Sequence, residues 1–75
     1  MKLQKGERYR HYKGKEYVIL GVGKHSETLE DLVIYEGQYV DPEFGDHPVW
    51  VRPLAMFLER VTSDGKEMPR FTLIS

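Results

Sequence analysis

The chain has 75 residues, of which 40% are hydrophobic, with no cysteine and a formal net charge of −1. This length allows one small domain, and the hydrophobic content argues against a disordered chain. A pI of about 6.3 argues against strong non-specific DNA binding, because domains that bind nucleic acid in that way usually have a pI above about 9.

The absence of cysteine bears on location and stability. The chain can form neither disulfides nor thiolate metal sites, which fits the reducing cytoplasm. Residues 1–5 lack the apolar segment of a signal peptide, and no stretch approaches the roughly 18 apolar residues of a membrane span. We therefore expect a cytoplasmic protein with no membrane partner.

Basic and acidic residues lie in different parts of the chain. Residues 1–16 contain six Lys and Arg residues against two Glu, whereas residues 27–46 contain seven acidic residues and no Lys or Arg. We interpret this asymmetry as solvated faces of opposite sign that attract each other.

The N-terminal part predicts a β-hairpin. Residues 1–6 are polar and are expected to be frayed, and residues 8–12 mix aromatic and basic residues as a half-buried strand does. Lys13 and Gly14 separate this strand from a second one over residues 16–23, and a glycine in so short a link is typical of a hairpin turn. Gly21 and Gly23 indicate a bend or the close approach of another strand.

Residues 24–28 predict a polar loop, and residues 29–39 allow two interpretations. Thr28 and Asp31 match a capping box, and apolar residues follow at helical spacing. Against a helix stand the β-branched and aromatic run over residues 32–35 and Gly37, which would interrupt it. We favour a strand and keep the helix as the alternative.

Residues 40–58 combine a loop, a short strand and a helical turn. Proline and glycine mark residues 40–48 as a loop, and residues 49–52 alternate as a strand does. Pro53 suits the first position of a helical turn. Apolar residues then recur at i, i+3 and i+4 and are expected to face the core: Leu54, Phe57 and Leu58. Met56 fits a core gap or the surface equally well.

The C-terminal part predicts extended structure with one tight turn. Residues 59–62 are extended, Asp64 and Gly65 indicate a hairpin-type turn, and residues 68–74 form a last strand that Pro69 confines to an edge at its start. Five short strands and one helical turn describe a mostly β fold. We expect a single small β-barrel, closed or nearly closed, over residues 1–75.

A large aromatic set could line a ligand-binding groove. Trp50 and Arg52 share the strand face opposite Val49 and Val51, and we expect them to face away from the core. Tyrosine and tryptophan offer stiff apolar faces on which a base or a peptide can pack. The candidate groove residues are Tyr9, Tyr12, Tyr35, Trp50 and Arg52, with Tyr17 and Tyr39 in the same aromatic set. The alternative is that so small a barrel uses these rings in its core and rim.

A second candidate site would bind an anion. Its residues are Arg8, Arg10, His11 and Lys13, joined by Arg52, since guanidinium groups match a phosphate or a carboxylate. The alternative is that these cations pair with the acidic middle of the chain.

The sequence offers little support for catalysis or metal binding. His25, Ser26 and Glu27 are neighbours in one loop, where a nucleophile and its base seldom reach the required geometry. We interpret residues 25–28 as a structural loop in which Ser26 and Thr28 bond nearby backbone groups. The three histidines, which are His11, His25 and His47, lack the spacing of common zinc motifs. We expect no metal site and no cofactor.

Three segments in order carry a family resemblance: RYRHYKG over residues 8–14, HSET over residues 25–28 and WVRPLAMF over residues 50–57. They resemble DUF1653, a small bacterial family with a domain of unknown function, and the resemblance extends from about Gly6 to Phe71. It implies an SH3-like barrel of intracellular bacterial origin. It implies no activity and no catalytic residue.

Three functions remain open from the sequence. The first is a non-catalytic binding or adaptor module with an aromatic and cationic groove for nucleic acid, a nucleotide or a peptide. The second is a small hydrolase or transferase that uses His25 or His11 with Glu27. The third is a structural accessory subunit of a larger assembly. The oligomeric state is not predicted.

Overall fold

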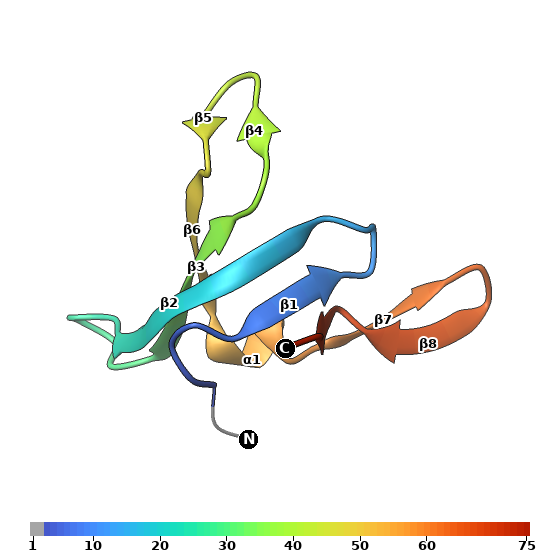
Figure 1. The fold of residues 1–75 in the computed structure, drawn as a ribbon. Helices are drawn as coiled ribbons and strands as arrows, with labels where there is room; N and C mark the ends of the chain where they lie inside the picture. Colours follow the sequence, from blue (N-terminus) through green and yellow to red (C-terminus); the bar gives the residue numbers. More distant parts are fainter. Residues whose placement is uncertain (1–2) are drawn as a thin grey trace.

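The computed structural model describes residues 3–75 and is mostly β, as the sequence predicts. An antiparallel five-stranded sheet has the order β6-β3-β2-β1-β9 (Figure 1). Its strands are β1 (Arg8–His11), β2 (Glu16–Lys24), β3 (Asp31–Gly37), β6 (Val49–Pro53) and β9 (Phe71–Leu73). Two small hairpins and one short helix complete the fold: β4 (Val40–Asp41) with β5 (Gly45–Asp46), β7 (Arg60–Ser63) with β8 (Lys66–Pro69), and α1 (Leu54–Phe57).

The predicted first hairpin is present. The His11 amide donates to the Lys15 carbonyl at 2.8 Å and closes the turn around Gly14. The ladder between β2 and β3 shifts its register between Ile19 and Gly21, so the predicted bend is a β-bulge. The bulge lets the nine-residue strand β2 curve beside two neighbours of different length.

Residues 31–37 form strand β3 and not the alternative helix. The strand lies in the middle of the sheet, with β2 on one side and β6 on the other. Its odd-numbered residues from Val33 to Gly37 are buried, and the residues between them are partly buried. The two neighbouring strands supply hydrogen-bond partners for the β3 backbone and cover its β-branched side chains. These interactions stabilise the strand more than a single capping box would stabilise a helix.

The C-terminal residues form a hairpin and a separate edge strand. Asp64 and Gly65 have φ values of 52° and 77°, and positive φ at both central positions is the signature of a type I′ turn. The predicted single strand over residues 68–74 is interrupted at Arg70. Its first half pairs with β7 and its second half pairs with β1. The predicted loop over residues 40–48 contains the short β4–β5 ladder.

One core joins the sheet to the helical turn. It consists of Leu3, Tyr9, Ile19, Val33, Tyr35, Phe57 and Phe71, with Leu54 packed against it. Leu58 is 40% exposed and does not face the core as predicted, because α1 ends at Phe57 and the chain turns away towards β7. The predicted frayed segment also needs correction: Leu3 is only 7% exposed, and the Gly6 amide donates to the Ile19 carbonyl at 2.8 Å. Residues 1 and 2 lie outside the described residues.

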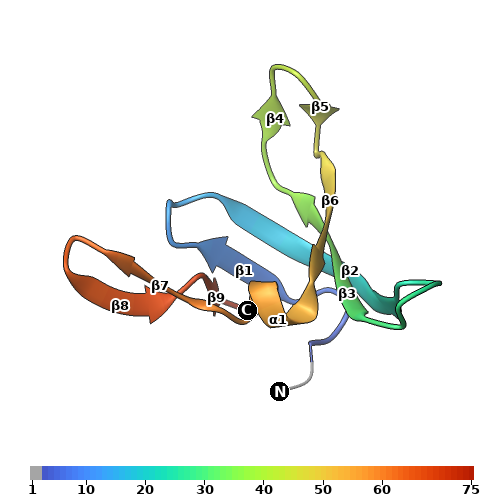
Figure 2. The same cartoon turned by 180° about the vertical axis from the view of Figure 1, so that it is seen from behind.

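A side chain of α1 connects the edge strand β9 to the central strand β3. Among residues 3–75, β6 and β9 are the end strands and form no ladder with each other, so hydrogen bonds do not close the predicted barrel. Figure 2 shows α1 lying between the end of β6 and the C-terminus. Phe57 of this helix stacks on Phe71 of β9 at 4.1 Å between ring centroids and meets Tyr35 of β3 edge-on at 5.4 Å. No helix in this part of the chain is long and apolar enough to cross a membrane.

Candidate functional site

Trp50 and Arg52 lie on the inner face of the sheet, together with the core. Trp50 is opposite Tyr35 in the β3–β6 register and packs against the core cluster, and the Arg52 Nε donates to the Tyr35 hydroxyl at 3.2 Å. Val49 and Val51 point outward and are exposed. The prediction therefore paired the right residues on each face, but it placed Trp50 and Arg52 on the wrong side. An indole offers far more apolar area to the core than a valine side chain does.

The other tyrosines of the predicted groove divide into two groups. Tyr9 and Tyr35 are each 5% exposed, and both contact Phe57 edge-on at 5.4 Å between ring centroids. Both tyrosines therefore belong to the core. Tyr12 is partly exposed at the end of the first hairpin, where the Lys13 ammonium lies 5.8 Å from its ring centroid.

A chain of hydroxyl contacts fixes the rings beside Trp50. The Trp50 Nε1 donates to the Tyr39 hydroxyl at 2.9 Å, and the Tyr39 and Tyr17 hydroxyls are 3.3 Å apart. Burial raises the pKa of Tyr17, and the hydrogen bond to Tyr39 raises it further. Tyr17 therefore keeps its proton at neutral pH and presents a neutral, polar-tipped ring.

His11 lies between aromatic rings in a positive environment. Its ring centroid is 4.6 Å from that of Tyr12 and 4.9 Å from that of Phe71. Its Nδ1 accepts a hydrogen bond from the Lys13 amide at 3.2 Å, so the neutral ring carries its proton on Nε2. Burial lowers the pKa of His11, and the charges of Arg52, Arg70 and Lys13 lower it further. The imidazole is thus neutral at pH 7 and available as a hydrogen-bond donor.

These residues form one patch, which we name the aromatic–cationic surface. It consists of His11, Tyr12, Lys13, Lys15, Tyr17, Tyr39, Trp50 and Arg52. Lys15 lies 4.3 Å from the Tyr39 ring centroid, and the Arg52 guanidinium lies 5.7 Å from that of Phe71. The patch draws on the first hairpin, the residue before β4, and β6, which meet on the inner face of the sheet.

The cations of this surface differ from most other cations of residues 3–75 in their partners. Within residues 3–75, Lys13, Lys15 and Arg52 form no ion pair with a carboxylate. Five of the other cations in this range do so, and Lys5 and Lys66 do not: the five are Arg8, Arg10, Lys24, Arg60 and Arg70. The surface therefore holds positive charge that the described part of the chain does not neutralise by direct contact.

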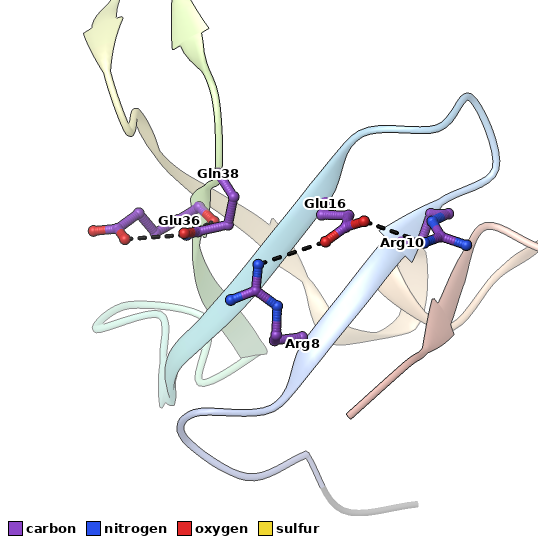
Figure 3. Close-up of polar contacts among 5 residues, drawn as sticks. All are labelled: Arg8, Arg10, Glu16, Glu36 and Gln38. Carbon is purple, nitrogen blue, oxygen red and sulfur yellow. Dashed lines mark hydrogen bonds and ion pairs between the residues drawn. The ribbon is translucent and has the colours of Figure 1, made fainter.

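Arg8 and Arg10, predicted to join His11 and Lys13 around an anion, lie on the opposite face of β1. Alternate residues of a strand point to opposite faces, so these arginines diverge from Tyr9 and His11. Both bind Glu16 of β2, at 3.5 Å from Arg8 and 3.1 Å from Arg10 (Figure 3). Hydrogen bonding from Arg10 is the largest cause that lowers the pKa of Glu16. The same face carries the Gln38 contact with Glu36 at 3.2 Å (Figure 3).

His25 has a structural role. Its Nδ1 accepts hydrogen bonds from the amides of Glu27 at 3.1 Å and Thr28 at 3.3 Å, and the Thr28 Oγ1 accepts one from the Glu30 amide. His25 follows the end of β2, whereas His11 lies beside its start, so the two histidines do not share a site (Figure 1). Over the described range, no group of three His, Asp or Glu residues is placed to hold a metal ion.

Comparisons with known proteins agree on one family. The family model described as "Protein of unknown function (DUF1653)" matches residues 7–73. A crystal structure of a DUF1653 protein from Bordetella bronchiseptica is similar to this chain, with 33% sequence identity and a TM-score of 0.81. The alignment covers 96% of this chain and 87% of that one. No curated protein matches the sequence significantly. The chain therefore belongs to the DUF1653 family, a family of unknown function.

Proposed function

We propose that the chain is a non-catalytic binding module whose aromatic–cationic surface takes an anionic group carried on a planar ring. A nucleotide, or the end of a single-stranded nucleic acid, has both parts. This proposal rests on a difference in ion pairing between the cations on the two faces of the sheet. Arg52, Lys13 and Lys15 have no carboxylate partner in the described part of the chain, whereas Arg8 and Arg10 on the opposite face share Glu16.

The chemistry of the patch fits the two parts of such a ligand. The Arg52 Nε already donates to the Tyr35 hydroxyl, which leaves the terminal nitrogens of the guanidinium to bind phosphate oxygens. The His11 Nε2 proton adds a neutral donor beside Arg52. Partly exposed rings of Tyr12, Tyr39 and Trp50 offer apolar faces to a base, whose stacking is typically worth about 1–3 kcal/mol.

The amount of charge limits the size of the ligand. Three cations can neutralise a few phosphates, whereas a long duplex needs a basic stripe and a high pI. The chain as a whole carries a net charge of −1. We therefore propose a small ligand or a strand end as the target, and not extended DNA.

NMR titration of ¹⁵N-labelled protein tests this proposal. Adenosine monophosphate should shift amides of residues 11–17, 39 and 50–52. Adenosine lacks the phosphate and ribose 5-phosphate lacks the base, so each should bind more weakly. Arg52→Gln should cost about 1.5–3 kcal/mol of binding free energy, the usual value of a hydrogen bond to a charged group. Affinity should also fall as salt rises.

Arg8→Gln is the matched control, because it removes the same charge from the opposite face, where Arg8 is paired with Glu16. It should leave the affinity unchanged. The ligand should also raise the pKa of His11, since a bound anion offsets Arg52, Arg70 and Lys13. Equal losses in Arg8→Gln and Arg52→Gln, or binding of adenosine as tight as that of its phosphate, would contradict the proposal. Binding of carboxylate peptides alone would assign the surface to a peptide.

A bacterial cytoplasmic setting is part of the same proposal. The similarity to the Bordetella bronchiseptica protein supports the bacterial origin. The lack of cysteine supports the reducing compartment, since small domains in oxidising compartments commonly depend on disulfides.

A further inference from the structure

A cavity lies beside β9, and none of the residues that line it belongs to the aromatic–cationic surface. Its volume is about 380 Å³, which is within the range of small-molecule sites. Its apolar lining comes from α1, β1 and β9, and includes Tyr9, Phe57, Leu58, Phe71 and Leu73. Leu58 and Leu73 are exposed, so the cavity continues into an apolar opening.

Two charged residues line this cavity, and only one is neutralised within residues 3–75. The Arg60 Nε binds the Glu67 carboxylate at 2.9 Å. Glu7 has no ion-pair partner among these residues. Its Oε1 accepts a hydrogen bond from the Gln4 amide at 2.8 Å, and its carboxylate also accepts one from the Tyr9 hydroxyl. Burial raises the pKa of Tyr9, and the Glu7 charge raises it further. The Glu7 carboxylate is therefore close enough to an aromatic lining residue to change its ionisation. The cavity thus combines an apolar interior with uncompensated negative charge.

We propose that this cavity binds a small organic cation with an apolar body, such as an arylalkyl ammonium compound. The apolar body occupies the space beside Phe71 and Leu73, and the ammonium group lies at Glu7. Aromatic rings attract cations through their negative faces, and the carboxylate adds a direct ion pair. An anionic ligand of the same shape meets the Glu7 charge without compensation. The proposal is independent of the ligand at the aromatic–cationic surface.

The test compares three probes of one shape on the ¹⁵N-labelled chain: phenethylamine, 2-phenylethanol and 3-phenylpropionate. The amine should bind most tightly and the acid least tightly, with shifts at the amides of Leu58, Thr72 and Leu73. The preference of amine over alcohol should be roughly twofold to fivefold, the range for a partly exposed ion pair. Glu7→Gln should abolish this preference and keep apolar binding, because glutamine retains an acceptor for the Gln4 amide.

Glu43→Gln is the matched control, since Glu43 lies in the exposed β4–β5 turn and does not line the cavity. It should keep the full preference for the amine. Equal affinity for amine and alcohol in the unaltered chain, or an undiminished preference in Glu7→Gln, would overturn the proposal. Amide shifts that the probes cause only at the aromatic–cationic surface would also overturn the proposal. These outcomes leave the nucleotide test unaffected, because the two tests change different residues.

Discussion

At the scale of single residues, Gly37 sets the position of Tyr39. A Cβ atom at this position would lie 2.5 Å from the Tyr39 Cε2 and 2.7 Å from its Cζ, far inside van der Waals contact. The ring can therefore lie over the end of β3 only because residue 37 has no side chain. From there its hydroxyl reaches both Trp50 and Tyr17. Gly37 thus acts on the aromatic–cationic surface through the ring of Tyr39.

We predict that Gly37→Ala displaces the Tyr39 ring while the sheet persists. The added methyl meets the mobile end of a side chain, so the ring moves in preference to the backbone. Trp50 fluorescence should change because its Nε1 loses the Tyr39 hydroxyl, and nucleotide affinity should fall. Gly21→Ala is the control, because a Cβ there meets nothing within 4 Å. Similar fluorescence in both variants would contradict this role of Gly37.

At the scale of elements, local signals predict local structure in this chain. Asp64 and Gly65 predict their turn because type I′ geometry needs positive φ at both positions, which few residue pairs tolerate. The β-branched and aromatic run over residues 32–35 predicts a strand. The break at Arg70 could not be read from the sequence, because it depends on which distant strand each half meets: β8 pairs with β7, and β9 pairs with β1.

The orientation of β6 shows the same limit. Alternation correctly predicts that Trp50 and Arg52 share one face and that Val49 and Val51 share the other. It does not state which face is covered, because that depends on the neighbours of the strand. Tyr35 supplies a hydroxyl for Arg52, and Tyr39 supplies one for Trp50, so both polar groups are satisfied on the inner face. Lys15, which joins the surface through Tyr39, carries no distinguishing signal in the sequence.

Matched substitutions on β3 and β6 test this orientation. Val33→Ala should destabilise the fold by about 2 kcal/mol, since it removes two fully buried methyl groups and leaves a cavity. Val51→Ala should change the free energy of unfolding by less than about 0.5 kcal/mol, because the Val51 side chain is 59% exposed. Both variants lose the same strand propensity, so the difference reports burial. Urea denaturation measures it, and equal losses would contradict the assigned faces.

At the scale of the whole molecule, the two faces of the sheet handle charge differently. On the outer face, Arg8 and Arg10 share Glu16, and these partners are close in the chain. On the inner face, Arg52 lies among aromatic rings. Its positive charge helps to lower the pKa of His11 and partly offsets the rise in the pKa of Tyr17. A domain of this size rarely has more than about 3–5 kcal/mol of stability. Titration of groups on the inner face should therefore change the free energy of unfolding measurably.

Stability should therefore fall on both sides of a plateau in pH. Tyr17 has a raised pKa, so above about pH 10 the unfolded chain loses this proton more readily than the folded chain does, and alkali destabilises the fold. His11 has a lowered pKa, so below about pH 6.5 the unfolded chain takes up a proton that the folded chain resists, and acid destabilises the fold. Urea denaturation from about pH 5.5 to 11 should show both limbs.

Two variants separate these limbs. Tyr17→Phe should make the alkaline limb shallower without removing it, because Tyr9 also has a raised pKa, and His11→Gln should flatten the limb between about pH 7.5 and 5.5. Glu16 and Asp41 do not disturb the second window, because their pKa values are lowered from already acidic values by Arg10 and by the Phe44 amide, respectively. His25→Gln is the control, since His25 lies in a different loop and should leave the slope in place. The opposite result would contradict this explanation. If the acid-side fall in stability vanishes in His25→Gln and persists in His11→Gln, the positive charges around His11 are not its cause.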